Sequence, residues 1–189
     1  MRMHSDALYG LTECLRPLTR GHKNDTFYNA LIASDGETLI ASNGAMIAEI
    51  AVDDCPPGLR GWEINGVDLV VTAKLHLKAS MVIMGWDGDS PHVTGWDAKR
   101  GPHSLRIQEK RTVPANTELL LAETPIAYSN AGRFGSIDTA TLARAAKAFS
   151  RYRSVACMPL LDEGRGTWLM SGNGLNRLSI LCGRVASAI

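Results

Sequence analysis

Side chains that could support catalysis are few and scattered in this sequence. It contains no G-x-S-x-G or H-E-x-x-H motif, and its five histidines are far apart. The glycine-rich "SGNG" at 171–174 lies between expected strands, without a helix N-terminus to bind an anion. Paired carboxylates such as Asp53 and Asp54 lie in expected turns, where solvated side chains are the default. We therefore expect neither an enzyme nor a cofactor.

Residues of the types that bind metals are present at the wrong spacing. Asp87, Asp89 and His92 surround a turn, but they fit no calcium loop and no bidentate Glu follows them. The four cysteines form no C-x-x-C pair and have no histidine at ligand spacing. We expect no metal site and no disulfide framework, and predict that all four are buried, reduced thiols: Cys14, Cys55, Cys157 and Cys182.

A basic segment, "TATLARAAKAFSRYR" at 139–153, has the clearest chemical pattern. We expect a helix that begins near Ile137 with Asp138 as its N-cap. At about 100° per residue, its apolar stripe consists of Leu142, Ala145, Ala146 and Phe149. The opposite stripe is basic, with Arg153 following it, and consists of Arg144, Lys147 and Arg151. No acid lies three or four residues away, so we predict uncompensated charge that either faces a polyanion or is solvated and binds nothing.

The charges of the whole chain are also unevenly distributed. Residues 1–95 contain 7 Lys/Arg and 12 Asp/Glu, whereas residues 96–189 contain 13 and 7. This distribution favours a polyanion-facing side or head-to-tail contacts between unlike ends, with chance as the alternative. At 189 residues and 45% hydrophobic, the chain can bury a core as one large or two small domains. Apolar runs are short and the start lacks a signal-peptide core, so we expect a cytoplasmic protein without a membrane span.

The N-terminal segment predicts a helix with Ser5 or Asp6 as its cap. Leu8, Leu11 and Leu15 fall on one stripe, and Pro17 is expected to end or kink the helix. The cations at its C-terminal end are explained by the helix dipole alone, and are Arg16, Arg20 and Lys23.

Strands are expected to follow. "IASDG" at 32–36 and "IASNG" at 40–44 predict two successive hairpins with tight turns, and so a three-stranded meander. Residues 67–78 fit either a helix with Asn65 near its start or a strand. "GWD" at 85–87 and 95–97 flanks a further hairpin, and "HSLRIQEKRTV" alternates like an exposed strand. After the basic helix, three strands close the chain: "SVACMPL", "GTWLMSG" and "LSILCGRVA".

This order of elements resembles the DNA sliding clamps of the bacterial DNA polymerase III beta-subunit type, in a short, phage-like form. The resemblance lies in "FYNALIASDGETLIASNGAMIAEIAV", in the segment from "GWEING" to "MGWDG", and in "IDTATLARAAKAFSR" with the strands after it. It implies an α+β fold of antiparallel sheets with two or three helices packed on one face. The implied units are 1–112 and a shorter half, 113–189, or one continuous domain.

The resemblance also implies a function. In clamps, basic helices line a central hole and contact the backbone of double-stranded DNA, so the lining residues here would be Arg144, Lys147, Arg151 and Arg153, with Lys74 and Lys78 if 67–78 is helical. The protein would be a DNA tether or processivity factor in replication that works with a DNA polymerase or another replication protein. A ring would need a homo-oligomer, a dimer or trimer. The alternative is a clamp-fold interaction module of a phage or mobile element that does not encircle DNA.

Overall fold

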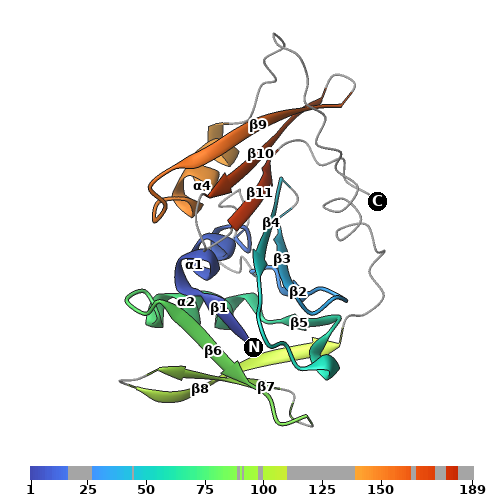
Figure 1. The fold of residues 1–189 in the computed structure, drawn as a ribbon, viewed down its shortest axis with the longest axis vertical. Coiled ribbons are helices and arrows are strands. Elements are labelled where there is room, and N and C mark those ends of the chain that lie inside the picture. Colours follow the sequence, from blue (N-terminus) through green and yellow to red (C-terminus); the bar gives the residue numbers. More distant parts are fainter. Residues whose placement is uncertain are drawn as a thin grey trace.

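The strands of the computed structural model form one antiparallel sheet (Figure 1). The structure describes residues 1–16, 27–43, 45–88, 90, 92–97, 100–109, 139–162, 165–172 and 178–182. Within them, 11 strands follow the order β1-β6-β7-β8-β5-β2-β3-β4-β11-β10-β9. Their bounds are β1 Arg2–His4, β2 Ala30–Ile32, β3 Thr38–Ser42, β4 Met46–Ala51, β5 Trp62–Ile64, β6 Met81–Gly85, β7 His92–Asp97, β8 Gly101–Glu109, β9 Val155–Asp162, β10 Arg165–Gly172 and β11 Leu178–Cys182.

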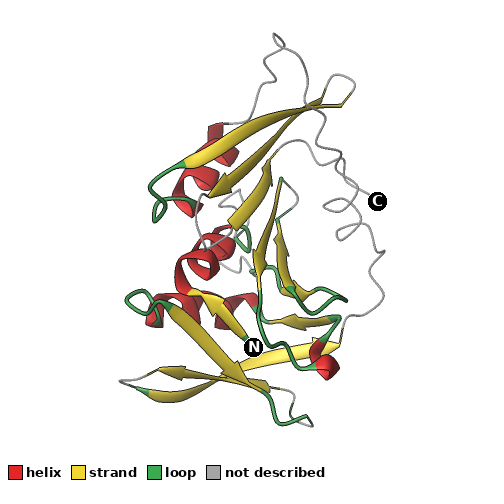
Figure 2. Ribbon diagram, in the orientation of Figure 1, coloured by secondary structure: helices red, strands yellow, loops and turns green. Residues whose placement is uncertain are grey.

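The helices gather on one side of this sheet, as Figure 2 shows. They are α1 Ser5–Glu13, α2 Gly66–Leu75 and α4 Thr139–Ala148. A short 3-10 helix, η1 Pro57–Leu59, lies apart from these three. The predicted fold class, α+β with antiparallel strands and two or three helices on one face, is therefore confirmed.

Helix α1 is buried along the predicted stripe, because Leu8, Leu11 and Leu15 are all fully covered. The predicted cap is wrong, since His4 occupies the N-cap position and its side chain makes no capping hydrogen bond. Ser5 is the first helical residue, and its hydroxyl donates to the carbonyl of Ala79 instead. The helix ends at Glu13, and Pro17 lies outside the described residues.

The predicted meander is confirmed as β2, β3 and β4. Alternation along β4 places Met46, Ala48 and Ile50 in the core. The "SDG" turn uses Gly36 at φ 75°, a conformation that favours glycine. The tight two-residue turn is wrong, because β2 and β3 pair no further than Ile32 and Leu39. Asp35 fills the longer loop, and its carboxylate accepts a hydrogen bond from the Glu37 amide at 2.7 Å.

The segment that fitted both a helix and a strand is helical over α2. Asn65 is its N-cap, and the side-chain oxygen accepts from the amides of Val67 and Asp68 at 3.1 and 3.2 Å. This cap satisfies donors that a helix start leaves free, which outweighs the β-branched content of "VDLVVT". Lys74 lies in the last helical turn, and Lys78 follows the helix end.

The basic segment is helical over α4, but the predicted buried stripe is partly wrong. Ala145 and Phe149 are buried as expected, whereas Leu142 is 42% exposed. Ala146 is also exposed, and Thr141 and Ala148 are buried instead. Helix α4 contacts both α1 and β11, so two neighbours rather than one decide which positions are covered. The predicted start at Ile137 and cap at Asp138 lie outside the described residues.

The two ends of the chain share one sheet and one core. Strand β11 pairs with β4 from Leu178 opposite Ile50 to Cys182 opposite Met46 (Figure 1). One hydrophobic cluster includes Leu11 of α1 and Ile180 of β11. The boundary expected at 112/113 lies outside the described residues.

Candidate nucleic-acid interface

The candidate interface is the layer of three helices, with α1 in contact with both α2 and α4 (Figure 1). Gly10 lets α1 and α4 approach closely. A Cβ at this position would lie 2.8 Å from the carbonyl oxygen of Ala148 and 2.3 Å from Cδ2 of Leu178. Contacts this short have no room for a side chain, so glycine determines the spacing of the two helices.

Glu13, at the end of α1, receives the basic face of α4. Its side chain is 1% exposed. Lys147 Nζ lies 3.1 Å from Glu13 Oε1, and Arg144 Nη1 lies 3.7 Å from Oε2. Arg16 Nε lies 3.8 Å from Oε1. The prediction of an uncompensated basic face is therefore wrong, because the acid comes from a helix about 130 residues earlier in the chain.

Arg151 lies after α4 and is also paired. Its Nε donates to the Asp6 carboxylate, and its Nη2 donates to the carbonyl oxygen of Leu77 at 2.7 Å. The guanidinium lies 5.9 Å from the centroid of the Tyr9 ring. Arg151 thus joins α1 to the segment that follows α2, through one hydrogen bond to each.

Lys74, Lys78 and Arg153 are exposed, and none has an ion pair within the part of the chain that the structure describes. Lys74 and Lys78 are therefore more available to a ligand than Arg151. Across 5–16, 66–78 and 139–153, the layer contains 7 Lys/Arg and 3 Asp/Glu. Its positive surplus persists after the internal ion pairs are formed.

The N-terminus of α2 is anchored to the sheet by polar contacts. Arg106 of β8 donates to Asp68 at 2.9 Å from Nε and 3.0 Å from Nη2, and its backbone amide donates to Asp68 at 2.9 Å. These hydrogen bonds lower the pKa of the Asp68 carboxyl below its usual range. A polar pocket of about 290 Å³ lies beside them, lined by Asn29, Asn65, His92, Arg106, Ile107 and Gln108.

The thiols differ in their surroundings. All four cysteines are free, and Cys14 and Cys182 are buried as predicted. Burial raises the pKa of Cys182 to about 12 and that of Cys14 further still. Cys55 is half-buried and Cys157 is exposed, so the prediction of four buried thiols is wrong for these two. Strand β9, which carries Cys157, is the last in the order of the described strands, and β10 is its neighbour there.

No group of three metal-binding side chains occurs among the residues with described positions. Asp87 accepts a hydrogen bond from the amide of Ser90 at 2.9 Å, while Asp89 lies outside the described residues. None of the described helices is long and apolar enough to cross a membrane.

The sequence interpretation missed the ion pairs made by two acids and one cation of the N-terminal segment: Asp6, Glu13 and Arg16. Arg16 was expected only to complement the helix dipole. No sequence pattern could have paired the acids of α1 with cations near 147, because the pairing depends on the docking of α1 against α4.

In comparisons with known proteins, the structure finds matches whereas the sequence does not. Neither a protein-family model nor a curated protein matches the sequence. The structure is similar to the DNA polymerase III beta subunit of Thermotoga maritima, with a TM-score of 0.58 at 9% identity over 100% of this chain and 65% of that one. It is similar to the DNA polymerase sliding clamp of Pseudomonas aeruginosa, with a TM-score of 0.60 at 10% identity over 97% and 65%. The sliding clamp of Bartonella birtlesii gives 0.55 at 10% over 97% and 64%.

The chain thus spans less than two thirds of the length of the clamps that it matches. Identities near 10% over essentially the whole chain carry information about the backbone, not about individual residues. The resemblance expected from the order of elements is confirmed at that level, and the protein has the fold of the DNA polymerase III beta sliding clamps.

Proposed function

We propose that this protein is a sliding-clamp-like tether that contacts the backbone of double-stranded DNA without reading its bases, as a cytoplasmic processivity factor in replication. One observation carries the proposal, namely that the helix layer of a clamp fold contains 7 Lys/Arg against 3 Asp/Glu. Cations on a helical surface neutralise phosphates whatever the sequence, which permits sliding. No catalytic step is needed from the chain, and none of its residues is assigned one.

The proposed DNA-binding residues fall into three groups. Lys74, Lys78 and Arg153 are exposed and available to phosphates directly. Arg144 and Lys147 share Glu13, so they contribute as a cluster. Arg151 contributes least, because Asp6 and Leu77 already occupy its guanidinium.

We further propose that the chain self-associates into a dimer or trimer around DNA. The clamps that it matches are longer chains, of which this chain spans 65%, so one copy supplies only part of a clamp. Light scattering on a size-exclusion column, at moderate salt and several concentrations, tests this. A stable dimer or trimer with longer retention on circular than on linear DNA supports a ring, whereas a strict monomer contradicts it.

DNA contact is tested by neutralising exposed lysines one at a time. Lys74→Gln and Lys78→Gln should each make the negative slope of the log binding constant against log salt shallower by about 0.9, because one phosphate contact is lost. Arg60→Gln is the matched control, since Arg60 is an exposed cation at the end of η1, away from the helix layer. Equal slopes for all three variants and the parent would refute the assignment of the helix layer.

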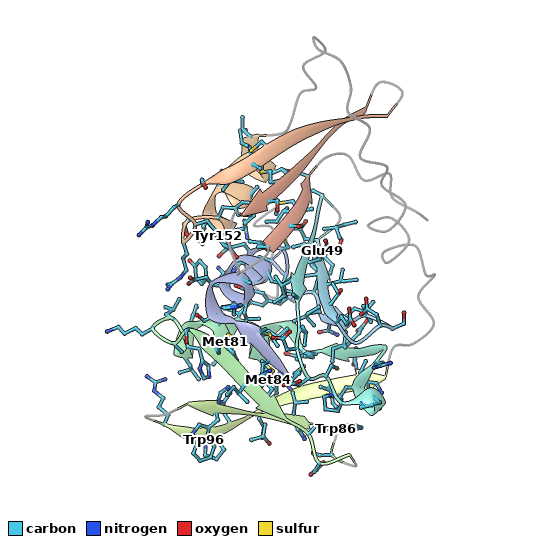
Figure 3. The ribbon with its side chains drawn as sticks, in the orientation of Figure 1. Glu49, Met81, Met84, Trp86, Trp96 and Tyr152 are labelled. Carbon is cyan, nitrogen blue, oxygen red and sulfur yellow. The ribbon has the colours of Figure 1, made fainter. Side chains whose placement is uncertain are left out.

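The alternative function, a protein-interaction module, is favoured by a different surface. Trp96 of β7 is 62% exposed and Ile83 of β6 is 56% exposed. Trp96 pairs with Pro102 across the β7/β8 ladder and points away from the body of the protein (Figure 3). An exposed tryptophan with apolar neighbours is typical of protein contacts, for instance with a DNA polymerase or another replication protein. Absence of salt-dependent DNA binding in the parent protein would leave this alternative.

A further inference from the structure

The polar pocket of about 290 Å³ beside the start of α2 has walls from segments that are distant in the chain. Strand pairing brings these segments together along β8. His92 of β7 lies opposite Arg106, and the amide of Asn65 donates to the carbonyl of Arg106 on the other side at 2.9 Å. Two residues further along β8, Gln108 lies opposite Glu63 of β5. We call this cavity the β8 pocket.

Hydrogen bonds hold the polar walls of the β8 pocket in fixed orientations. Asn65 Oδ1 accepts from two amides in the first turn of α2 and from Arg106 Nη2 at 3.2 Å. Three donors at one oxygen determine which way this side-chain amide is turned. On the other wall, Gln108 Nε2 donates to the Glu63 carboxylate at 3.0 Å. Both side-chain amides are therefore ordered before any ligand arrives, which lowers the entropic cost of binding.

Each of these two amides keeps one group without a hydrogen bond among the described residues. For Asn65 the unused group is the Nδ2 donor, and for Gln108 it is the Oε1 acceptor. The half-buried imidazole of His92 makes no hydrogen bond there either, because the bond to Ser90 Oγ comes from the backbone amide of His92. The β8 pocket thus offers a ligand one donor, one acceptor and one flat aromatic ring.

The charges around the β8 pocket disfavour an anion. Arg106 is already bound to Asp68, to which its Nε donates at 2.9 Å and its Nη2 at 3.0 Å. The Glu63 carboxylate accepts from Asn29 and Gln108 at 3.1 and 3.0 Å, but it has no ion pair within the described part of the chain. A phosphate would meet a paired cation and a negative carboxylate. A neutral ligand with its own donors and acceptors avoids this repulsion.

We propose that the β8 pocket binds one nucleobase, with Asn65 Nδ2 and Gln108 Oε1 at its hydrogen-bonding edge and His92 against its ring. A nucleobase is neutral and planar, and side-chain amides of asparagine and glutamine pair with the donors and acceptors of base edges. Histidine is one of the side chains on which unpaired bases stack. The cavity lies near the lower end of the range for small-molecule sites, roughly 300–1,000 Å³, which suits a single nucleoside.

The base has two sources with the same chemistry, a free nucleoside and an unpaired base of a single strand. Both present the same edge to Asn65 and Gln108. The site goes beyond the proposed DNA tether, which contacts only the duplex backbone through the helix layer. It does not depend on the tether, so either proposal can fail while the other stands.

An NMR titration of the full chain tests the β8 pocket. The parent protein is titrated with thymidine, deoxyadenosine and deoxycytidine, and with 2-deoxyribose as the control that lacks a base. We expect the nucleosides, but not the sugar, to shift the side-chain amide signal of Asn65 and the backbone amide signal of Ile107 until saturation. The expected Kd is about 1 mM, from two hydrogen bonds and one stacked ring. Absence of saturable shifts well above that concentration overturns the site.

Two variants and a matched control show which side chains bind the base. Gln108→Leu removes the acceptor at similar size and should weaken nucleoside binding by about fivefold, because one hydrogen bond is lost. His92→Leu removes the aromatic ring and should weaken binding at least as much. Ser104→Ala is the control, since Ser104 is exposed on the same strand, opposite Thr94, but does not line the pocket. If Gln108→Leu fails to fold, His92→Leu decides alone. Parent affinity in the folded variants overturns the site.

Oligonucleotides distinguish the two sources of the base and separate this site from the tether. A thymidine single strand that shifts the Asn65 and Ile107 signals, with a duplex that leaves them unchanged, supports an unpaired base as the ligand. Shifts with nucleosides but not with the single strand support a free nucleoside. Salt-dependent duplex binding without any nucleoside shifts overturns the β8 pocket and leaves the tether. Nucleoside binding without duplex affinity supports the pocket and refutes the tether.

Discussion

Gly66, the first residue of α2, offers the sharpest test of how closely α2 packs against segment 27–29. A Cβ added here would lie 1.8 Å from the carbonyl oxygen of Tyr28 and 3.1 Å from Cβ of Phe27. Segment 27–29 cannot easily yield, because the amide of Tyr28 donates to the carbonyl of Leu15 at 2.9 Å. Asn29 also accepts from the Gly66 amide at 3.3 Å. The Cβ of Gly66→Ala would therefore overlap the carbonyl oxygen of Tyr28, and the backbone would have to move to relieve the clash.

The expected cost of Gly66→Ala combines three terms. Overpacking in a well-filled site costs about 1–3 kcal/mol. Loss of the Asn29 hydrogen bond adds about 1 kcal/mol. The higher helix propensity of alanine returns about 1 kcal/mol at most, and less at a helix start. The net loss is about 1–4 kcal/mol, which for a chain of this size lowers the melting temperature by roughly 2–16 °C.

Thermal unfolding followed by circular dichroism measures this change. Gly85→Ala is the control, because a Cβ at Gly85 would meet nothing within 4 Å. We expect that control to stay within about 0.5 kcal/mol of the parent. A Gly66→Ala protein as stable as the parent would show that α2 is not held against Tyr28 as described.

Three further predictions concern other contacts. Gly10→Ala should be destabilised by about 1 kcal/mol in chemical denaturation, because the clash between α1 and α4 exceeds the helix-propensity gain of about 1 kcal/mol; greater stability would contradict the close approach. The lowered pKa of Asp68 means that its hydrogen bonds with Arg106 stabilise the fold fully above the unfolded pKa of about 4, and that this stabilisation is lost as the pH falls from there through the lower folded pKa. The stability difference between the parent and Asp68→Asn should therefore shrink in acid, and a constant difference would refute this. A thiol reagent at pH 8 should modify exposed Cys157 rapidly, whereas Cys182 should react only on unfolding.

Local patterns predicted most of the elements correctly. The spacing of Leu8, Leu11 and Leu15 predicted the N-terminal helix correctly. Alternating apolar residues, with turn residues between them, predicted the meander and the later hairpins. Residues 67–78 stayed ambiguous because β-branched residues lower helix propensity only slightly. The Asn65 cap and the hydrogen bond between Arg106 of β8 and Asp68 favour the helix in this segment.

The buried face of α4 could not be predicted from periodicity alone. A single apolar stripe assumes one neighbour, but α4 contacts α1 and β11 together. That geometry buries Thr141 and Ala148 and leaves Leu142 exposed. Exposure of Cys157 has the same origin, since it depends on the position of β9 at the end of the sheet.

The sequence by itself determined the types and order of most elements, the regions of the turns and the positive charge of the C-terminal helix, because these depend on neighbours within a few residues. Only the tertiary structure decided what that charge meets. Glu13 and Asp6 lie far from α4 in the chain, and they reach Lys147 and Arg151 because Gly10 lets α1 approach α4 closely. Ion pairs between distant segments depend on helix docking, which no local pattern encodes.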